Sequence, residues 1–110
     1  MKLVHLLQSP VKGKKLRGVF SDGSKIDFGS DVSQTYVEGA TVQKRNAYWK
    51  RHLANAVENE RIRRLVPSAS LLSAYVLWLT PSIRDNVRAL NNALTHSKHH
   101  SSVDALLHEF

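Results

Sequence analysis

The residues best suited to chemistry are cationic, and they fall in three clusters along the chain. The clusters are Lys12, Lys14, Lys15 and Arg17; Lys44, Arg45, Lys50, Arg51 and His52; and Arg61, Arg63 and Arg64. Sixteen Lys and Arg stand against nine Asp and Glu in 110 residues, which gives a formal net charge of +7. A chain this basic attracts polyanions, which include nucleic acid, acidic protein surfaces and anionic lipid. We therefore predict that these clusters bind a polyanion or an acidic protein partner.

No arrangement of residues in the sequence indicates catalysis. Glu58 and Glu60 are the closest acids, but side chains two residues apart point to different sides of a helix. The glycines match neither dinucleotide-binding nor phosphate-loop spacing, and no Ser lies in a recognisable nucleophile turn. We predict a protein that is not an enzyme and that needs no cofactor.

A histidine-rich stretch late in the chain has a spacing that could bind a metal. His96 and His100 are four residues apart, so on a helix they could share one metal ion. However, Lys98 lies between them, no acidic ligand is near, and the chain contains no Cys. We predict no metal site there and interpret the stretch as a polar hinge. The lack of Cys also excludes disulfides and thiolate metal sites.

The first forty residues favour strands and turns, which would carry the first cationic cluster. Leu3 to Leu7, Leu16 to Phe20 and Lys25 to Phe28 have the composition and alternation of strands. Asp22-Gly23, within Ser21 to Ser24, is typical of a tight hairpin. A sheet of two or three strands cannot stand alone and must pack against a helix. Asp31 to Ala40 is interpreted as a loop.

Residues 41–94 favour three helices, which would carry the other two clusters. Thr41 is the expected N-cap of a helix from Val42 to about Leu65, which Pro67 ends. Ser68 or Ser70 can cap a second helix over Leu71 to Leu79, which is apolar nearly all round and is therefore expected in the core. The third helix is expected from Pro81 to Leu94, with Thr80 as its cap and Pro81 at the first helical position.

Apolar stripes predict which helix faces are buried. The expected stripes are Val42, Trp49, Leu53, Ala56 and Leu65 in the first helix, and Ile83, Val87, Leu90 and Leu94 in the third. Trp49 and Trp78 are expected in the core. Lys44 and Arg45 would lie at the positive end of a helix dipole, where cations are mildly unfavourable, so we expect them to meet an anion.

The end of the chain is predicted to be a docking segment. Residues 95–101 are polar, and a short helix is expected to follow them with one apolar face formed by Val103, Leu106, Leu107 and Phe110. A helix of about two turns is not stable alone in water, so it needs a surface to dock on. We predict one domain over residues 1–94, followed by this hinge and helix. The apolar runs are too short for a membrane span or a signal peptide, so we expect no membrane span and no secretion.

Several motifs in a fixed order carry a family resemblance. They are Val19-Phe20-Ser21-Asp22-Gly23 followed by Ile26-Asp27-Phe28-Gly29; Tyr36; Tyr48 with Arg51-His52, matching Tyr-x-x-Arg-His; and Leu72-Ser73 with Leu77-Trp78 and Pro81, matching Leu-Ser-x-x-x-Leu-Trp-x-x-Pro. Over roughly residues 14–90 the chain resembles a small domain family of unassigned function, encoded by large nucleocytoplasmic double-stranded DNA viruses. It departs from that family at Val37 to Ala40 and in the tail from Thr95.

The resemblance implies a viral origin and no assigned activity. Together with the residue patterns it predicts an α+β fold, in which a small antiparallel meander packs against three helices and a short C-terminal amphipathic segment follows. The expected function is that of a non-enzymatic virion protein, a basic minor capsid protein that cements or bridges beneath the capsid shell. Its expected partners are capsid proteins of the same particle, self-association is left open, and it would be made in the host cytoplasm. The alternative is a non-specific DNA-binding protein associated with the viral genome.

Overall fold

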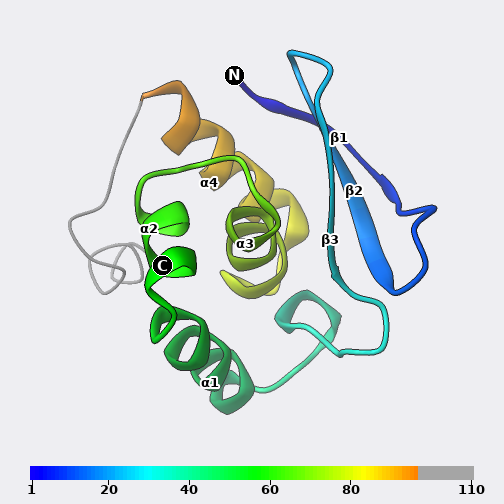
Figure 1. Ribbon diagram of the computed structural model, residues 1–110. Helices are drawn as coiled ribbons and strands as arrows, with labels where there is room; N and C mark the ends of the chain where they lie inside the picture. Colours follow the sequence, from blue (N-terminus) through cyan, green and yellow to red (C-terminus); the bar gives the residue numbers. More distant parts are fainter. Residues whose placement is uncertain (97–110) are drawn as a thin grey trace.

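The protein, seen in a computed structural model that describes residues 1–96, pairs a small sheet with a group of short helices (Figure 1). The strands β1 (Leu3–Gln8), β2 (Lys14–Phe20) and β3 (Lys25–Ser30) are antiparallel and lie in the order β1-β2-β3. The structure therefore confirms the predicted meander and the α+β fold class. Each strand is one or two residues longer than its alternation predicted, so Lys14 and Lys15 belong to β2.

One face of the sheet is buried against the helices. Leu3, Phe20 and Phe28 point into the core, each less than 5% exposed. At Gly18 the sheet lacks a side chain, and an added Cβ would lie 3.0 Å from the Cδ1 atoms of Leu3 and Leu72. This gap in β2 therefore lets a helix approach the strand closely.

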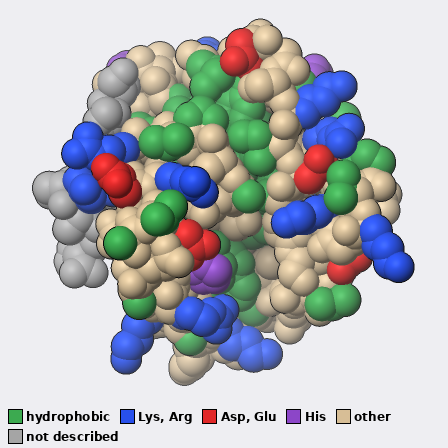
Figure 2. Space-filling model, in the orientation of Figure 1, with side chains coloured by type: hydrophobic (Ala, Val, Ile, Leu, Met, Phe, Trp, Pro, Cys, Tyr) green, Lys and Arg blue, Asp and Glu red, His purple; other side chains and the backbone are tan. Residues whose placement is uncertain are grey.

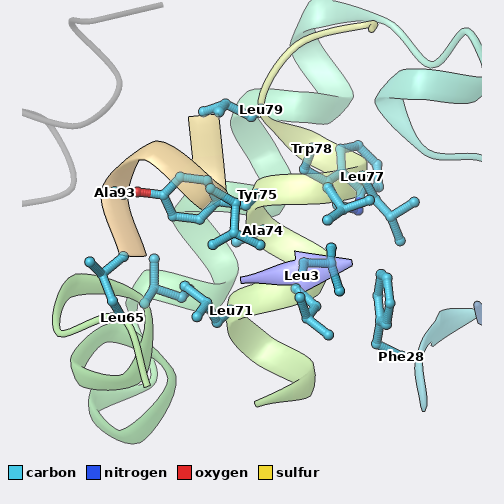
Figure 3. Close-up of a cluster of buried hydrophobic side chains, with 14 of the residues drawn as sticks. Leu3, Phe28, Leu65, Leu71, Ala74, Tyr75, Leu77, Trp78, Leu79 and Ala93 are labelled. Atoms are coloured by element: carbon cyan, nitrogen blue, oxygen red, sulfur yellow. The ribbon is translucent and has the colours of Figure 1, made fainter. Parts of the chain in front are cut away.

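The helical residues surround one central segment. The elements are η1, a 3-10 turn (Tyr36–Glu38); α1 (Val42–Leu53); α2 (Ala56–Arg63); α3 (Ala69–Leu72); η2, a π-helical turn (Ser73–Leu77) that continues α3; and α4 (Ile83–Thr95). Every residue from Leu71 to Leu79 except Ser73 is buried, which confirms the predicted core position of this segment. Figure 3 shows its side chains packed between the sheet and the other helices. No helix among the described residues is long and apolar enough to cross a membrane.

The predicted helix from Val42 to Leu65 is wrong as a single element, because it breaks between α1 and α2. Asn55 has an extended backbone, with φ −84° and ψ 116°. Its side-chain oxygen accepts hydrogen bonds from the backbone N–H groups of Val57 and Glu58, which makes it the N-cap of α2. Of the expected stripe, Trp49 and Leu65 are buried and Leu53 packs against the core, whereas Val42, 51% exposed, and Ala56 are not buried.

The start of the last helix also differs from the prediction. Ser82, not Thr80, is the N-cap: its hydroxyl accepts from the backbone N–H of Asp85 at 3.2 Å, and α4 begins after Pro81. Ile83, predicted to be buried, is 40% exposed. The buried face of α4 is instead centred on Asn86, Leu90 and Ala93. Of the predicted stripe, Leu90 is buried and Val87 and Leu94 pack against the core, so the prediction is wrong at Ile83 and missed Asn86, because it counted only apolar residues.

Gly29 lies where the sheet contacts the core segment, and it gives a first testable prediction. Gly29 has φ +79°, and an added Cβ would lie 2.9 Å from Leu77 Cδ1 and 3.2 Å from Lys15 Cβ. Gly29→Ala should lower the free energy of unfolding by about 2–3 kcal/mol, through backbone strain and this crowding. Gly13→Ala is the matched control, because Gly13 has φ +86° with nothing within 4 Å. The control should lose only about 1 kcal/mol in urea denaturation, and equal losses would show that crowding at Gly29 costs nothing.

A cationic pocket as the candidate functional site

Two cations of the first predicted cluster form ion pairs within the molecule. Arg17 donates two hydrogen bonds to the carboxylate of Asp27, at 3.0 and 3.1 Å, on the outer face of the sheet. Lys15 Nζ donates to Glu38 Oε1 at 2.7 Å. These bonds hold the pKa of Asp27 and the pKa of Glu38 below their usual values. Both carboxyls therefore stay ionised at neutral pH and occupy the two cations.

Arg45 has a structural partner in place of the anion expected from the sequence. Its Nη2 donates to the backbone oxygen of Leu79 at 3.0 Å, and its Nε donates to that of Trp78 at 3.4 Å. Its guanidinium also lies 5.7 Å from the centre of the Tyr36 ring. Carbonyl groups at the end of the central segment carry partial negative charge, and this favours a cation. Arg45 therefore fastens α1 to the core.

His52 and Arg64 also have partners in the molecule. His52 Nδ1 lies 2.9 Å from Glu58 Oε2 across the break between α1 and α2. Arg64 Nε lies 3.1 Å from Glu60 Oε1 one turn away in sequence, and both side chains are more than half exposed. An exposed pair of this kind is screened by solvent and stabilises little, so Arg64 remains open to competition from another anion.

The remaining predicted cations have no hydrogen-bond or ion-pair partner among residues 1–96. We call them the free cations: Lys12, Lys14, Lys44, Lys50, Arg51, Arg61 and Arg63. Lys12 and Lys14 lie at the end of the sheet that carries the β1–β2 turn, and the other five lie on α1 and α2. Figure 2 shows Lys and Arg side chains spread over both sides of one face, with acidic side chains between them. Of the three predicted clusters, these seven residues are therefore the ones whose charge is available to bind a partner.

Free cations from two of these places border one pocket of about 330 Å³. Its walls come from the loop before η1, from α1, α2, α3 and η2, and from the open end of the β2–β3 pair, where Lys14 lies opposite Ser30. Lys14 lies on the sheet side and Arg51 on the α1 side. Most of the other polar residues of the lining carry hydroxyls, namely Ser30, Ser33, Thr35, Tyr48, Ser70 and Ser73. The hydroxyls of Thr35 and Ser70 already donate to Glu38 and Glu58, and the other four have no side-chain donation to a described residue. This arrangement can hold an anion between two cations and several hydrogen-bond donors.

Tyr48 is held in the pocket wall by two neighbouring rings. It stacks on Trp78 with ring centres 4.6 Å apart and planes 7° apart, and it lies 4.1 Å from the ring of His52. Burial raises the pKa of Tyr48 well above its usual value, and the negative charge of Glu58 raises it further. The phenol therefore stays protonated at all ordinary pH values and remains a hydrogen-bond donor.

The acidic group of the pocket is already engaged. Glu58 contacts His52 through Oε2 at 2.9 Å and accepts from the Ser70 hydroxyl through Oε1 at 3.4 Å. Both His52 and Glu58 are about 30% exposed, so the pair lies at the pocket surface. Sequence reasoning missed Glu58 and Ser70, because only the break at Asn55 brings α2 against α1.

The pocket also gathers residues from separate motifs of the resemblance described above. Tyr48, Arg51 and His52 lie at positions i, i+3 and i+4 of α1, a spacing that places side chains on one face. Ser73, Leu77 and Trp78 also line the pocket, with the Trp78 ring stacked on Tyr48, and Gly29 lies at the open end of the β2–β3 pair. The i, i+3, i+4 spacing was the sequence signal that could have indicated this site.

Other predicted positions do not contribute to the pocket. Arg61 and Arg63 lie on α2 outside its lining. The predicted docking residues Val103, Leu106, Leu107 and Phe110 lie outside the described residues, as do Lys98 and His100. His96 follows α4 and is exposed.

The sequence was compared with those of known protein families, curated proteins and solved structures. A family of unknown function (DUF5754) matches residues 4–52, which include β2, β3 and nearly all of β1 and α1. An uncharacterized protein, L851, of Acanthamoeba polyphaga mimivirus is 34% identical over 76 residues, which span 64% of this chain and 76% of the relative. No solved structure matches the chain.

Proposed function

Because the chain belongs to the family of unknown function DUF5754 and has a mimivirus relative, we propose that it is a non-enzymatic virion protein of a large double-stranded DNA virus. Its role is that of a small basic minor capsid protein, which cements or bridges beneath the capsid shell. The observation that supports this role is the set of free cations at the hairpin end, on α1 and on α2. Cations without internal partners on a compact fold suit a surface that binds acidic neighbours.

The state of the pocket residues supports a binding role over a catalytic one. The contact between His52 and Glu58 has the form of a general base and its orienting carboxylate. For nucleophilic catalysis such a pair also needs a hydroxyl or thiol within hydrogen-bond reach of the second ring nitrogen. No hydroxyl of residues 1–96 makes a hydrogen bond to His52. Tyr48 stays protonated and does not supply a nucleophilic oxygen.

The location of the protein in gently opened virus particles tests this proposal. We expect mass spectrometry to find it with the capsid fraction and not with the released genome. Lys44→Glu with Lys50→Glu should reduce its retention in that fraction by about tenfold or more, because two attractions become repulsions. Recovery of the unaltered protein mainly with the genome would exclude the capsid role.

A matched control separates this local effect from net charge. Lys2→Glu with Lys25→Glu changes the net charge by the same amount, and both residues are exposed. Lys2 precedes β1 and Lys25 begins β3, so neither lies on α1, which carries Lys44 and Lys50. The control should therefore keep wild-type retention, and equal losses in both variants would indicate general charge attraction.

DNA binding is the second candidate, and the arrangement of α1 favours it. Lys44 and Arg51 are seven residues apart on this helix, so they lie on one side, and Lys50 is adjacent to Arg51. Three such contacts to phosphates would release counterions and give a slope of about −2.7 in log affinity against log salt. A gel shift across salt concentrations measures this slope, and the absence of a shift at low salt would exclude the candidate.

A further inference from the structure

The pocket has features that attraction to an acidic protein surface does not require. Its volume of about 330 Å³ lies near the lower end of the range for small-molecule sites, which is roughly 300–1,000 Å³. Most of its lining comes from α1, α2, α3, η2 and the open end of the β2–β3 pair, and the loop before η1 completes it. A flat partner surface would leave such a hollow unfilled.

The groups around the hollow favour a negatively charged occupant with several acceptor oxygens. Lys14 and Arg51 line the space from different elements and have no ion-pair partner among the described residues. The hydroxyls of Tyr48, Ser33 and Ser73 add donors between them. A carboxylate offers two oxygens and one charge, whereas a phosphate monoester offers three terminal oxygens and a charge of about −1.5 to −2. The number and spread of these donors therefore fit phosphate better.

The one acidic residue in the lining has both oxygens engaged. The Glu58 carboxylate lies against His52 on one oxygen and against the Ser70 hydroxyl on the other. The lining therefore has two cations, Lys14 and Arg51, against one carboxylate, which leaves it with net positive charge.

We propose that this pocket binds the phosphate monoester group of a small phosphorylated ligand of about nucleotide size. Arg51 supplies a two-pronged contact to the phosphate oxygens, Lys14 supplies charge from the opposite side, and Tyr48 donates its hydroxyl. The same chemistry occurs in a free nucleotide and in the terminal phosphate of a nucleic acid strand. The site does not depend on a place beneath the capsid shell, so either proposal can fail while the other holds.

Isothermal titration calorimetry on the full chain at low salt tests the site. The probes are adenosine monophosphate, adenosine, inorganic phosphate, and one short single-stranded oligonucleotide with and without a 5′-phosphate. We expect adenosine monophosphate to bind and adenosine not to bind. A preference for the phosphorylated oligonucleotide over the nucleotide would identify a strand end as the source. Failure of every phosphate probe to bind at millimolar concentration, or equal binding of adenosine, would overturn the proposal.

Variants of equal charge separate the pocket from the general positive field. Arg51→Gln should weaken binding of adenosine monophosphate by about tenfold or more, because a charge-assisted contact is lost. Arg61→Gln removes the same charge from α2 outside the pocket and should change binding by less than about twofold. Tyr48→Phe keeps the stacked ring and should weaken binding by about three- to tenfold. Equal losses for Arg51→Gln and Arg61→Gln would contradict a specific site, and thermal unfolding of each variant shows whether it remains folded.

Discussion

Replacing Asn86 with Ala should lower the free energy of unfolding by about 4 kcal/mol, a large share of the roughly 5–15 kcal/mol that a domain has. The side chain is fully buried, and its Nδ2 donates to the backbone oxygens of Val76 and Thr80, both at 2.9 Å. Its Oδ1 accepts from the backbone N–H of Thr80 at 3.0 Å and from the Thr80 hydroxyl at 2.6 Å. Alanine would leave the buried Val76 oxygen and the part-buried backbone groups of Thr80 without this partner, and each buried unpaired group costs about 1–3 kcal/mol.

Asn92→Ala provides the matched control for this prediction. Asn92 lies on the same helix, is exposed, and makes no side-chain hydrogen bond among the described residues. Its replacement should be neutral or stabilise by a few tenths of a kcal/mol, since Ala favours helix more than Asn does. Urea unfolding followed by circular dichroism measures both variants. A loss below about 1 kcal/mol for Asn86→Ala would mean that water or a backbone shift replaces its bonds.

Asn86 also explains why the buried face of α4 could not be predicted from apolar spacing. A stripe of apolar residues put Ile83 and Leu90 inside, but the structure leaves Ile83 40% exposed and buries Asn86 beside Leu90. Burial of an amide depends on acceptors and donors provided by another part of the chain. Here they come from Val76 in η2 and from Thr80 in the segment before α4, whose conformation is not visible in the sequence.

The strands were predictable because their signals are local. Alternation over a few residues, the Asp-Gly turn and the flanking Pro10 and Gly29 each act within the strand or at its end. The side chain of Asp22 accepts from the backbone N–H and the hydroxyl of Ser24, so the turn is stabilised by its own residues. The fold class followed from these strands and from the apolar segment at Leu71 to Leu79.

The candidate site was only half predictable. Lys14 and Arg51 were identified from their charge, but the sequence did not show that the open end of the β2–β3 pair and α1 border one pocket. Glu58 reaches His52 because Asn55 ends one helix and caps the next. An N-cap residue within an irregular apolar pattern was the available signal, and it was outweighed by the expectation of one long helix.

The second large effect is expected at Trp49, which the sequence correctly placed in the core. Its side chain is 2% exposed, and its Nε1 donates to the backbone oxygen of Trp78 at 2.9 Å. Trp49→Ala should cost about 4 kcal/mol, from the cavity and from the carbonyl that loses its partner. The same change removes the edge contact to Tyr48, whose ring centre is 6.0 Å away, and should therefore loosen the pocket wall.

Trp49→Phe separates the ring from its hydrogen bond. Phenylalanine keeps most of the apolar area and cannot donate, so the loss should be about 1–2 kcal/mol, measured by urea unfolding with circular dichroism. The Trp78 carbonyl then has only the 3.4 Å contact from Arg45 Nε, which is near the limit of a useful hydrogen bond. If Phe costs as much as Ala, the hydrogen bond joins α1 to the core more strongly than the packed ring does. Because Trp78 stacks on Tyr48, the carbonyl that holds Trp49 belongs to a residue of the pocket wall, so core stability and the shape of the site depend on the same contact.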